Sequence, residues 1–463
     1  MSRPDANPAI APEPDAPAPR AVAAPAGGRS APDPGDACPG ALRLHAADDG
    51  HLARLRLPGG LLTAPEAALV ADLADGLGDG HLDLTSRGNL QLRGLPADAG
   101  AALAAALGGA GLLPSAVHER VRNVLASPLA GLDGLGHGDL RPWVAELDAL
   151  LCGAPEFARL SGRFLFACDD GRGDVAALDA DVTLVDLGGG EAGLRVPGAA
   201  ELRLAHADAP RAATAVAAGF LAAVPRGARA WRVGELPADR ALDTDRVRAL
   251  LTAAGITVRD AAPEPPRPAR PPLPRSPALG PVAGPDGLTA LSLLVPLGRV
   301  ATGTWRAVAE LAARGGAGQV RVTPWRGLVL PGFTAAGAPQ ALAEAVGAGL
   351  VASADSPWAG VTACTGRPGC AKSLADVRAD AAAVVAAPPP AAGPGREVAA
   401  ARAAAAGGPL PVHWSGCERR CGHPRGAWVD VLAHAPGPAG GPGSYRVAVH
   451  GPDGSRPAPG GRP

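Results

Sequence analysis

Alternating apolar and polar positions near the start of the chain predict a strand–helix–strand unit. The segment RLRLPG, residues 54–59, alternates like a strand. Thr63 to Glu66 spell TAPE, a capping box with proline in the first turn, so a helix is expected through about Gly76. Residues 81–94, HLDLTSRGNLQLRG, alternate again and predict a strand followed by its return.

The same unit recurs without a gap 238 residues later, the separation between Pro58 and Pro296. Alanine and glycine are over-used and inflate chance matches, but matches of other residue types hold the same register through a strand, a helix and a strand. Identical pairs include Pro58 and Pro296, Val70 and Val308, Thr85 and Thr323, and Leu90 and Leu328. We interpret the pattern as an internal duplication.

Composition divides the chain further. The N-terminal stretch is rich in alanine and proline and is expected to be disordered, and Pro263 to Gly287, opening PEPPRPARPPLPRSP, predicts a semi-rigid linker. The predicted parts are a disordered tail (1–37), a first half domain (38–117), a first larger module (118–262), the linker (263–287), a second half domain (288–354), a second larger module (355–455) and a flexible tail (456–463).

Charge and hydropathy narrow the classes of function. The formal net charge of the 463 residues is −1, so no nucleic-acid partner is expected. The N-terminus lacks the apolar core of a signal peptide, and no later segment has the length and apolarity of a membrane span. Thiolates would be oxidised outside the cell, which predicts a cytoplasmic protein without membrane contact.

Four of the seven cysteines form two close pairs, Cys364 with Cys370 and Cys417 with Cys421. They lie in ACTGRPGCAKS and HWSGCERRCGHP, where neighbouring glycines allow the backbone to wrap closely around a bulky group. The pattern predicts a four-thiolate metal site. An iron–sulfur cluster, a structural zinc and unligated buried thiols all remain open, although zinc pairs are usually spaced two to four residues apart.

Polar residues occupy alternate positions in LTSRGNLQLRG: Thr85, Arg87, Asn89, Gln91 and Arg93. Alternation places them on one face of a strand, either as the solvent face or as a site for a carboxylate-rich ligand.

In the second copy, RVTPWRGL combines the aromatic face of Trp325 with the cations Arg321 and Arg326. These side chains could stack on and pair with a large aromatic ligand, but Trp325 is equally plausible as a core residue.

The pattern C-x5-C followed by G-C-x3-C-G is similar to the cluster motif of the nitrite and sulfite reductase superfamily. CTGRPGCA, VHWSGCERRCGHP and VTPWRGLVL resemble in particular its branch of precorrin monooxygenases. The resemblance covers about residues 38–455. It implies an α+β fold with duplicated ferredoxin-like half domains and two larger α/β modules in a pseudo-two-fold arrangement. It also implies a 4Fe-4S cluster held by the four cysteines.

The resemblance also assigns substrate residues. The superfamily's Thr-x-Arg lies on a tetrapyrrole, which implies this role for Arg87, and VRNVLASPLAG places Arg122 and Asn123 at the Arg-Asn pair beside it. The predicted substrate-binding residues are Arg87, Asn89, Gln91, Arg122, Asn123, Arg163, Arg321 and Arg326.

One departure from the superfamily is informative. Its oxyanion reductases use a Lys-x-Lys pair as proton donors, but LSGRFLFACDD has Arg163 and Leu165 there, and Lys372 is the only lysine of the chain. Arginine does not readily release a proton near neutral pH, so oxyanion reduction is disfavoured, while Arg163 could still bind a carboxylate.

The resemblance therefore implies a monooxygenase that hydroxylates precorrin-3A at C20, with γ-lactone formation, in aerobic cobalamin biosynthesis. Its partners would be the tetrapyrrole substrate and dioxygen. A mononuclear non-haem iron is an expected second cofactor with unassigned ligands, for which His413 and His423 are candidates.

Electrons are expected from a separate NAD(P)H-dependent donor, because Gly188 to Gly193 match a dinucleotide motif but predict a hairpin turn. One alternative is a siroheme-dependent sulfite or nitrite reductase in which Cys421 bridges cluster and haem. Another is a non-catalytic tetrapyrrole carrier with zinc.

Overall fold

The computed structural model describes residues 38–225, 229–261, 276–386, 394–403, 409–424, 426–435 and 444–451. The two predicted tails, 1–37 and 456–463, lie outside the described residues, as does the predicted linker up to residue 275.

The first half domain folds where the alternation predicts it. Thr63 caps α1: its hydroxyl accepts from Glu66 N, and the Glu66 carboxylate accepts from Thr63 N at 2.7 Å, so the predicted capping box is confirmed. Its elements are β1 (His45–Ala47), β2 (Gly50–Leu55), β3 (Leu61–Thr63), α1 (Ala64–Leu77), β4 (His81–Leu84), β5 (Leu90–Leu95) and α2 (Ala99–Gly109).

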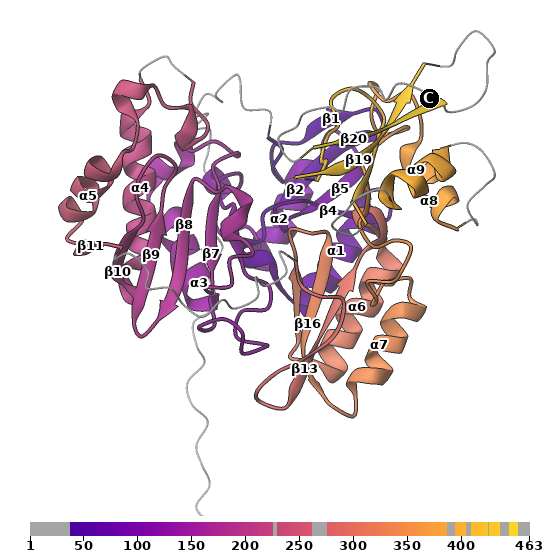
Figure 1. Ribbon diagram of the computed structural model, residues 1–463, viewed down its shortest axis with the longest axis horizontal. Coiled ribbons are helices and arrows are strands. Elements are labelled where there is room, and N and C mark those ends of the chain that lie inside the picture. The colour runs from indigo at the N-terminus through magenta and orange to yellow at the C-terminus, as the bar shows by residue number, and fades with distance from the viewer. Residues whose placement is uncertain are drawn as a thin grey trace, which may run out of the picture. The chain divides into compact units, whose positions relative to one another are not determined.

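The second half domain repeats these elements, and β13, β14, α6 and β15 each begin 238 residues after β2, β3, α1 and β4. The predicted duplication is therefore confirmed. The elements are β12 (Gly280–Ala283), β13 (Leu288–Leu294), β14 (Arg299–Ala301), α6 (Thr302–Gly315), β15 (Gln319–Val322), β16 (Gly327–Thr334) and α7 (Ala338–Gly347). In Figure 1, α6 and α7 lie side by side against this sheet.

The end of the predicted linker needs correction, because β12 lies inside residues 263–287. It pairs antiparallel with β13 at the edge of the sheet, where Pro281 removes no donor that an inner neighbour requires. A proline-rich composition therefore concealed an edge strand.

The two half domains exchange edge strands. The sheet orders are β1-β2-β5-β4-β14 and β12-β13-β16-β15-β3, so each half supplies the last strand of the other's sheet. One hydrophobic core runs through both halves. At its centre Trp305 of α6 is fully buried, and its indole Nε1 donates to the Ala67 carbonyl of α1 at 2.8 Å.

Two glycines that are identical in the repeat leave no room for a side chain. Gly60 has a φ of 71°, and a Cβ there would lie 2.0 Å from the Val322 carbonyl oxygen of the other half. Gly298 has a φ of 69°, and a Cβ there would lie 2.4 Å from Cδ of Arg326 in the same half. A side chain at either position would strain the backbone, and at Gly60 it would also push the two halves apart.

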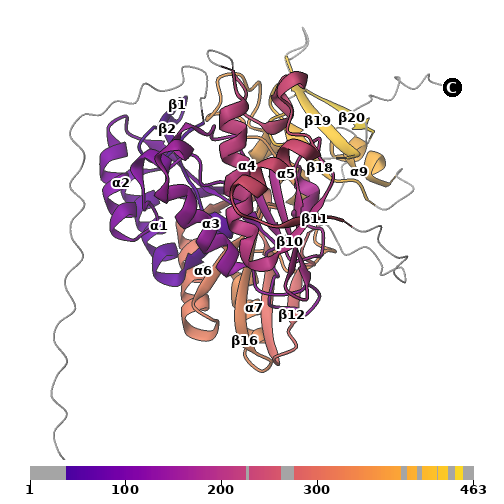
Figure 2. The same ribbon diagram turned by 90° about the vertical axis from the view of Figure 1, so that its left-hand side faces the viewer.

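The first module is a six-stranded sheet in the order β11-β10-β9-β8-β7-β6. Strands β6, β7 and β8 are parallel, and β8 turns back into β9 directly after Gly188, so the predicted hairpin is confirmed. The elements are β6 (Val124–Ala126), α3 (Arg141–Gly153), β7 (Phe166–Asp169), β8 (Val182–Gly188), β9 (Glu191–Arg195), β10 (Leu202–Ala205), α4 (Ala209–Ala223), α5 (Thr244–Ala253) and β11 (Val258–Asp260). Figure 2 shows α4 and α5 over this sheet.

The second module has the same pattern in four strands, ordered β17-β18-β19-β20. Strands β17, β18 and β19 are parallel and β20 is antiparallel. Its elements are β17 (Val361–Ala363), α8 (Val377–Ala386), α9 (Pro394–Ala403), β18 (Val412–Ser415), β19 (Trp428–His434) and β20 (Ser444–His450). Among the helices of the described residues, none has the length and apolarity needed to cross a membrane.

Candidate metal centre and substrate site

The two cysteine pairs lie on loops that follow neighbouring parallel strands. Cys364 comes directly after β17, and Cys417 comes two residues after the end of β18. Because parallel neighbours end at the same edge of a sheet, the two loops meet there. Gly416 N donates to the Cys364 sulfur at 3.3 Å, and Cys364 N donates to the Trp414 carbonyl at 2.9 Å.

The neighbouring thiols affect the ionisation of Cys364 and Cys421. Burial raises the pKa of Cys421, and the thiols of Cys364, Cys417 and Cys370 raise it further, while Arg419 opposes them. Burial also raises the pKa of Cys364, with added contributions from Cys417 and Cys370. A cationic metal centre would replace the thiol protons and relieve this repulsion, so the donor set fits a thiolate-bound metal.

The spacing of the thiols bears on the choice of metal. In the described ranges, no three His, Cys, Asp or Glu side chains are grouped so as to hold one metal ion. Four thiolates about 2.3 Å from one zinc would lie roughly 3.8 Å apart. The described residues give no support to the predicted mononuclear iron.

Each half domain contributes one arginine to a cysteine loop. Arg93 of β5 donates Nη2 to the Gly369 carbonyl at 2.9 Å and is fixed by two bonds of 2.8 Å to the Asp49 carboxylate. Arg326 donates Nη2 to the Gly422 carbonyl at 3.2 Å. The structure thus places Arg326, a predicted substrate residue, directly beside Cys421.

The two histidines near the second pair have protein partners. His413 is fully buried, its Nδ1 lies 2.9 Å from the Thr362 hydroxyl, and its Nε2–H donates to the Cys421 carbonyl at 3.1 Å. Burial and then Arg326 lower the pKa of His413 to about 3, so the ring is neutral. His423 stacks on Trp428 with ring centroids 5.1 Å apart. These contacts position the cysteine loop.

The predicted polar strand face is wrong for part of its length. Residues 85–89 form the turn between β4 and β5, in which Gly88 has a φ of 62°. The Thr85 hydroxyl accepts from the backbone N–H groups of Arg87 at 3.3 Å and Asn89 at 3.2 Å. Only Gln91 and Arg93 lie on β5, and Gln91 accepts from Arg54 at 3.0 Å.

The turn nevertheless brings three predicted residues together. Arg87 Nη1 and Asn123 Nδ2 both donate to the Gly162 carbonyl, at 3.0 and 2.9 Å. Asn89 Nδ2 donates to Asn123 Oδ1 at 3.4 Å. Burial lowers the pKa of Arg87, and an anionic ligand would offset the cost of that burial.

Arg163 and Leu165 occupy the two positions that are lysines in the superfamily's oxyanion reductases. Their side chains lie in different surroundings. Arg163 is exposed, and its guanidinium carbon lies 4.3 Å from the ring centroid of Trp231, a cation–π contact. Leu165 is 4% exposed and belongs to a small apolar cluster with Leu125 and Val175. A proton donor at position 165 would therefore face the core.

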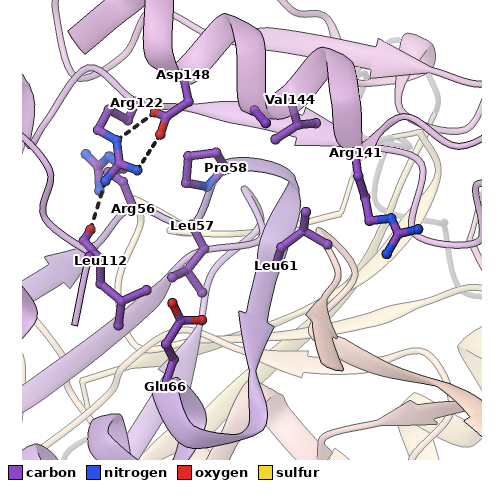
Figure 3. A pocket seen from close by; sticks show the side chains of 12 residues that line it. Arg56, Leu57, Pro58, Leu61, Glu66, Leu112, Arg122, Arg141, Val144 and Asp148 are labelled. Atoms are coloured by element: carbon purple, nitrogen blue, oxygen red, sulfur yellow. Dashed lines mark hydrogen bonds and ion pairs between the residues drawn. The ribbon is translucent and has the colours of Figure 1, made fainter. Parts of the chain in front are cut away.

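Arg122 and Arg321 have structural partners. Arg122 donates Nε and Nη2 to Asp148 at 2.7 Å each, and Nη1 to the Leu112 carbonyl at 2.9 Å (Figure 3). Arg321 donates Nη1 to the carbonyls of Pro128 and Ala130, at 2.8 and 3.0 Å. With their donors engaged in this way, neither guanidinium is directed at the turn of residues 85–89.

Figure 3 shows a cavity of about 280 Å³ beside Arg122, with Arg56 next to it. Sequence reasoning missed Arg56, which is 3% exposed. Burial, and then repulsion by Arg54, lower its pKa to about 9. The signal available in the sequence is the pair Arg54 and Arg56 inside RLRLPG, two cations in an otherwise apolar segment.

Comparison with known proteins identifies the half domains. Residues 45–110 and 282–347 each match the family described as nitrite/sulfite reductase ferredoxin-like half domain. The chain carries this half domain twice. The predicted resemblance and fold class are thereby confirmed.

Two relatives match most of the chain. Precorrin-3B synthase of Sinorhizobium sp is 27% identical over 418 residues, covering 90% of this chain and 83% of the relative. Ferredoxin–nitrite reductase of Synechococcus elongatus is 28% identical over 413 residues, covering 82% of this chain and 76% of the relative. Both relatives are oxidoreductases.

Among solved structures, the Mycobacterium tuberculosis NirA protein matches with a TM-score of 0.67 at 23% identity. The match covers 86% of this chain and 74% of that chain. At this identity the likeness establishes the fold.

Proposed function

We propose that the protein is an iron–sulfur monooxygenase with the activity of precorrin-3B synthase, hydroxylating precorrin-3A at C20 with γ-lactone formation in aerobic cobalamin biosynthesis. The observation that carries the proposal is the pair of positions 163 and 165. Arg163 lies over Trp231 and Leu165 faces the core, so these two positions offer a cation that can bind a carboxylate but no lysine that could deliver protons. The match to precorrin-3B synthase over 90% of the chain supports the same activity.

Cys364, Cys370, Cys417 and Cys421 would hold a 4Fe-4S cluster. Their mutual effect on ionisation and the backbone donor at Gly416 fit such a group. When bound, the cluster would supply single-electron transfer. Arg93 and Arg326, through the carbonyls of Gly369 and Gly422, would hold the two cysteine loops at a fixed separation.

The substrate is proposed to bind at the turn of residues 85–89. Arg87 and Arg163 remain charged throughout the working pH range and would pair with peripheral acetate and propionate groups. Asn89 and Asn123 bond to each other and, through Gly162, to Arg87, so they would fix the orientation of that guanidinium. Gln91 follows this turn on β5, and Arg326 lies near Cys421; both are proposed to contribute secondary contacts.

Reducing equivalents are proposed to come from a separate NAD(P)H-dependent donor. The segment that matches a dinucleotide motif is a β-hairpin, whereas such a site needs a helix N-terminus after its strand. The name of one relative, ferredoxin–nitrite reductase, is in keeping with electron delivery by another protein.

A second candidate is a siroheme-dependent nitrite or sulfite reductase, in which Cys421 would bridge cluster and haem. It is favoured by the ferredoxin–nitrite reductases, one of which is 28% identical over 82% of this chain. The positions of Arg163 and Leu165 weigh against it, because multi-proton reduction needs a general acid with a pKa near the working pH.

The test begins with anaerobic purification, quantification of iron and acid-labile sulfide, and optical and EPR spectra. The protein is then assayed with precorrin-3A, a reductase system and labelled dioxygen. We expect iron and sulfide in equal amounts and labelled oxygen in the product. Turnover of nitrite or sulfite without dioxygen incorporation, together with a siroheme spectrum, would establish the reductase instead. Zinc without sulfide would establish a carrier.

A further inference from the structure

Cys38 lies at a point where two buried arginines converge. A Cβ built on Gly162 would lie 2.7 Å from Cβ of Cys38 and 3.3 Å from its sulfur, so the cysteine packs directly on that backbone. The Gly162 carbonyl accepts from Arg87, and Arg56 Nε donates at 3.3 Å to the Arg120 carbonyl, which lies 3.4 Å from the same built Cβ. Cys38, Arg56 and Arg87 therefore surround Gly162.

The position of Cys38 is fixed by the turn that follows it. The buried Glu119 carboxylate accepts from the backbone N–H groups of Ala41 and Leu42 at 2.7 Å each, and from that of Arg43 at 3.3 Å. Gly40 is needed for this contact, because a Cβ there would lie 2.3 Å from the same carboxylate. The turn thus holds the cysteine against the arginines.

Arg56 provides independent evidence that a ligand binds near Cys38. It is 3% exposed, and within the described part of the chain its Nη1 and Nη2 have no hydrogen-bond partner. A buried guanidinium with both terminal nitrogens unpaired is destabilising, and a carboxylate matches its two-pronged geometry. Arg56 lines the cavity of Figure 3.

We propose that Cys38, Arg56 and Arg87 form a thiolate site that binds small carboxylate-bearing electrophiles and reacts with them. The arginines favour the thiolate over the thiol and hold the reagent's carboxylate. The thiolate sulfur attacks the carbon that carries the leaving group: a C–S bond forms, the carbon–leaving-group bond breaks, and the leaving group departs with its electron pair. The thiol proton has already passed to solvent. This site depends on neither the cluster nor the proposed function.

The experiment compares two alkylating reagents that are similar in size but differ in charge. The full chain is treated at pH 7 with iodoacetate, which is anionic, or with iodoacetamide, which is neutral, and labelling of each cysteine is followed by peptide mass spectrometry. Cys152 is the internal control: it is also half-buried, and burial together with Asp148 raises its pKa to about 11.

We expect Cys38 to be labelled by iodoacetate at least about tenfold faster than Cys152, since an ordinary thiol is only a few per cent ionised at pH 7. We also expect Cys38 to prefer iodoacetate, and Cys152 to prefer iodoacetamide. Labelling of Cys38 no faster than that of Cys152, or without preference for the anionic reagent, would overturn the proposal.

Two arginine variants locate the origin of the preference. Arg56→Gln and Arg87→Gln should each reduce the iodoacetate rate at Cys38 at least fivefold and leave the iodoacetamide rate at Cys152 unchanged. Arg87→Gln covers the case in which removing the buried Arg56 prevents folding, which circular dichroism would report. An unchanged iodoacetate preference in the folded Arg87→Gln variant would also overturn the proposal. Cys38→Ser should remove the label.

Discussion

Replacing Arg122 with alanine is expected to weaken the first module and to leave substrate binding nearly intact. The guanidinium makes two bonds of 2.7 Å to the Asp148 carboxylate on α3 and one of 2.9 Å to the Leu112 carbonyl. These contacts join residue 122, just before β6, to α3, the helix that packs on this strand. The matched variant, Arg87→Ala, removes a cation whose guanidinium donates to the Gly162 carbonyl.

The size of the effect follows from the burial of the ion pair. The side chains of Arg122 and Asp148 are 6% and 18% exposed, and removing one partner of a buried pair costs about 3–5 kcal/mol. Water can reach the Asp148 carboxylate in part, which favours the lower end of that range. The lost bond to Leu112 adds about 1 kcal/mol. We therefore expect Arg122→Ala to lower the free energy of unfolding by about 3–4 kcal/mol.

Urea unfolding followed by circular dichroism measures this loss, and titration with precorrin-3A measures the dissociation constant. Arg87→Ala should raise the dissociation constant at least about tenfold, because one charged hydrogen bond contributes roughly 1.5–3 kcal/mol. In the double variant Arg122→Met, Asp148→Leu most of the lost stability should return, since apolar residues of similar volume can replace a buried pair. If Arg122→Ala kept full stability and lost substrate binding, the structural role would be refuted.

Three further predictions follow from the cysteine loops, the shared core and the first module. Replacing Cys364, or any other cysteine of the two pairs, by serine should abolish the visible iron–sulfur absorbance, while Cys38→Ser should preserve it. Retention of colour, iron and sulfide in the variant that lacks all four cysteines would contradict the assignment. Trp305→Ala should cost about 3–5 kcal/mol in urea unfolding, because a fully buried side chain and its bond to Ala67 are lost; an unchanged midpoint would contradict the shared core. Burial and Asp169 raise the pKa of Asp174 to about 7 from 3.8, so the folded protein holds a proton that the unfolded chain releases. Stability should therefore fall as pH rises from about 4 to 7, by up to about 1.4 kcal/mol per unit, and Asp174→Asn should flatten this slope.

The sequence predicted best those features that local chemistry decides. A capping box specifies its own hydrogen bonds, so Thr63 and Glu66 located the start of α1 correctly. The repeat was visible because residue types other than alanine and glycine, such as Pro58 and Pro296, hold one register through a strand, a helix and a strand. Cysteine spacing pointed to two loops, and the structure places both at one sheet edge, because Cys364 and Cys417 follow adjacent parallel strands.

The features it could not predict depend on contacts distant in the chain. Alternation continued through residues 85–89, where the turn places Arg87 on Gly162, 75 positions later. The exchange of β3 and β14 leaves no local pattern, because an edge strand has the same composition whichever sheet it joins. The role of Arg122 depends on its ion pair with Asp148, 26 positions later in the chain.

The two modules share a topology, but only the second carries the proposed metal centre. Ser127 follows β6 as Cys364 follows β17, and each backbone N–H donates to the third residue of the next strand, Cys168 at 3.1 Å and Trp414 at 2.9 Å. At the equivalent edge of the first module, the polar groups form hydrogen bonds with one another. The Ser127 hydroxyl donates to Asp174 at 2.5 Å, and the Asp169 carboxylate accepts from the N–H groups of residues 171, 173 and 176. With its polar groups satisfied internally, this edge is a structural counterpart of the cysteine loops, and the described residues of the first module add no thiol pair there.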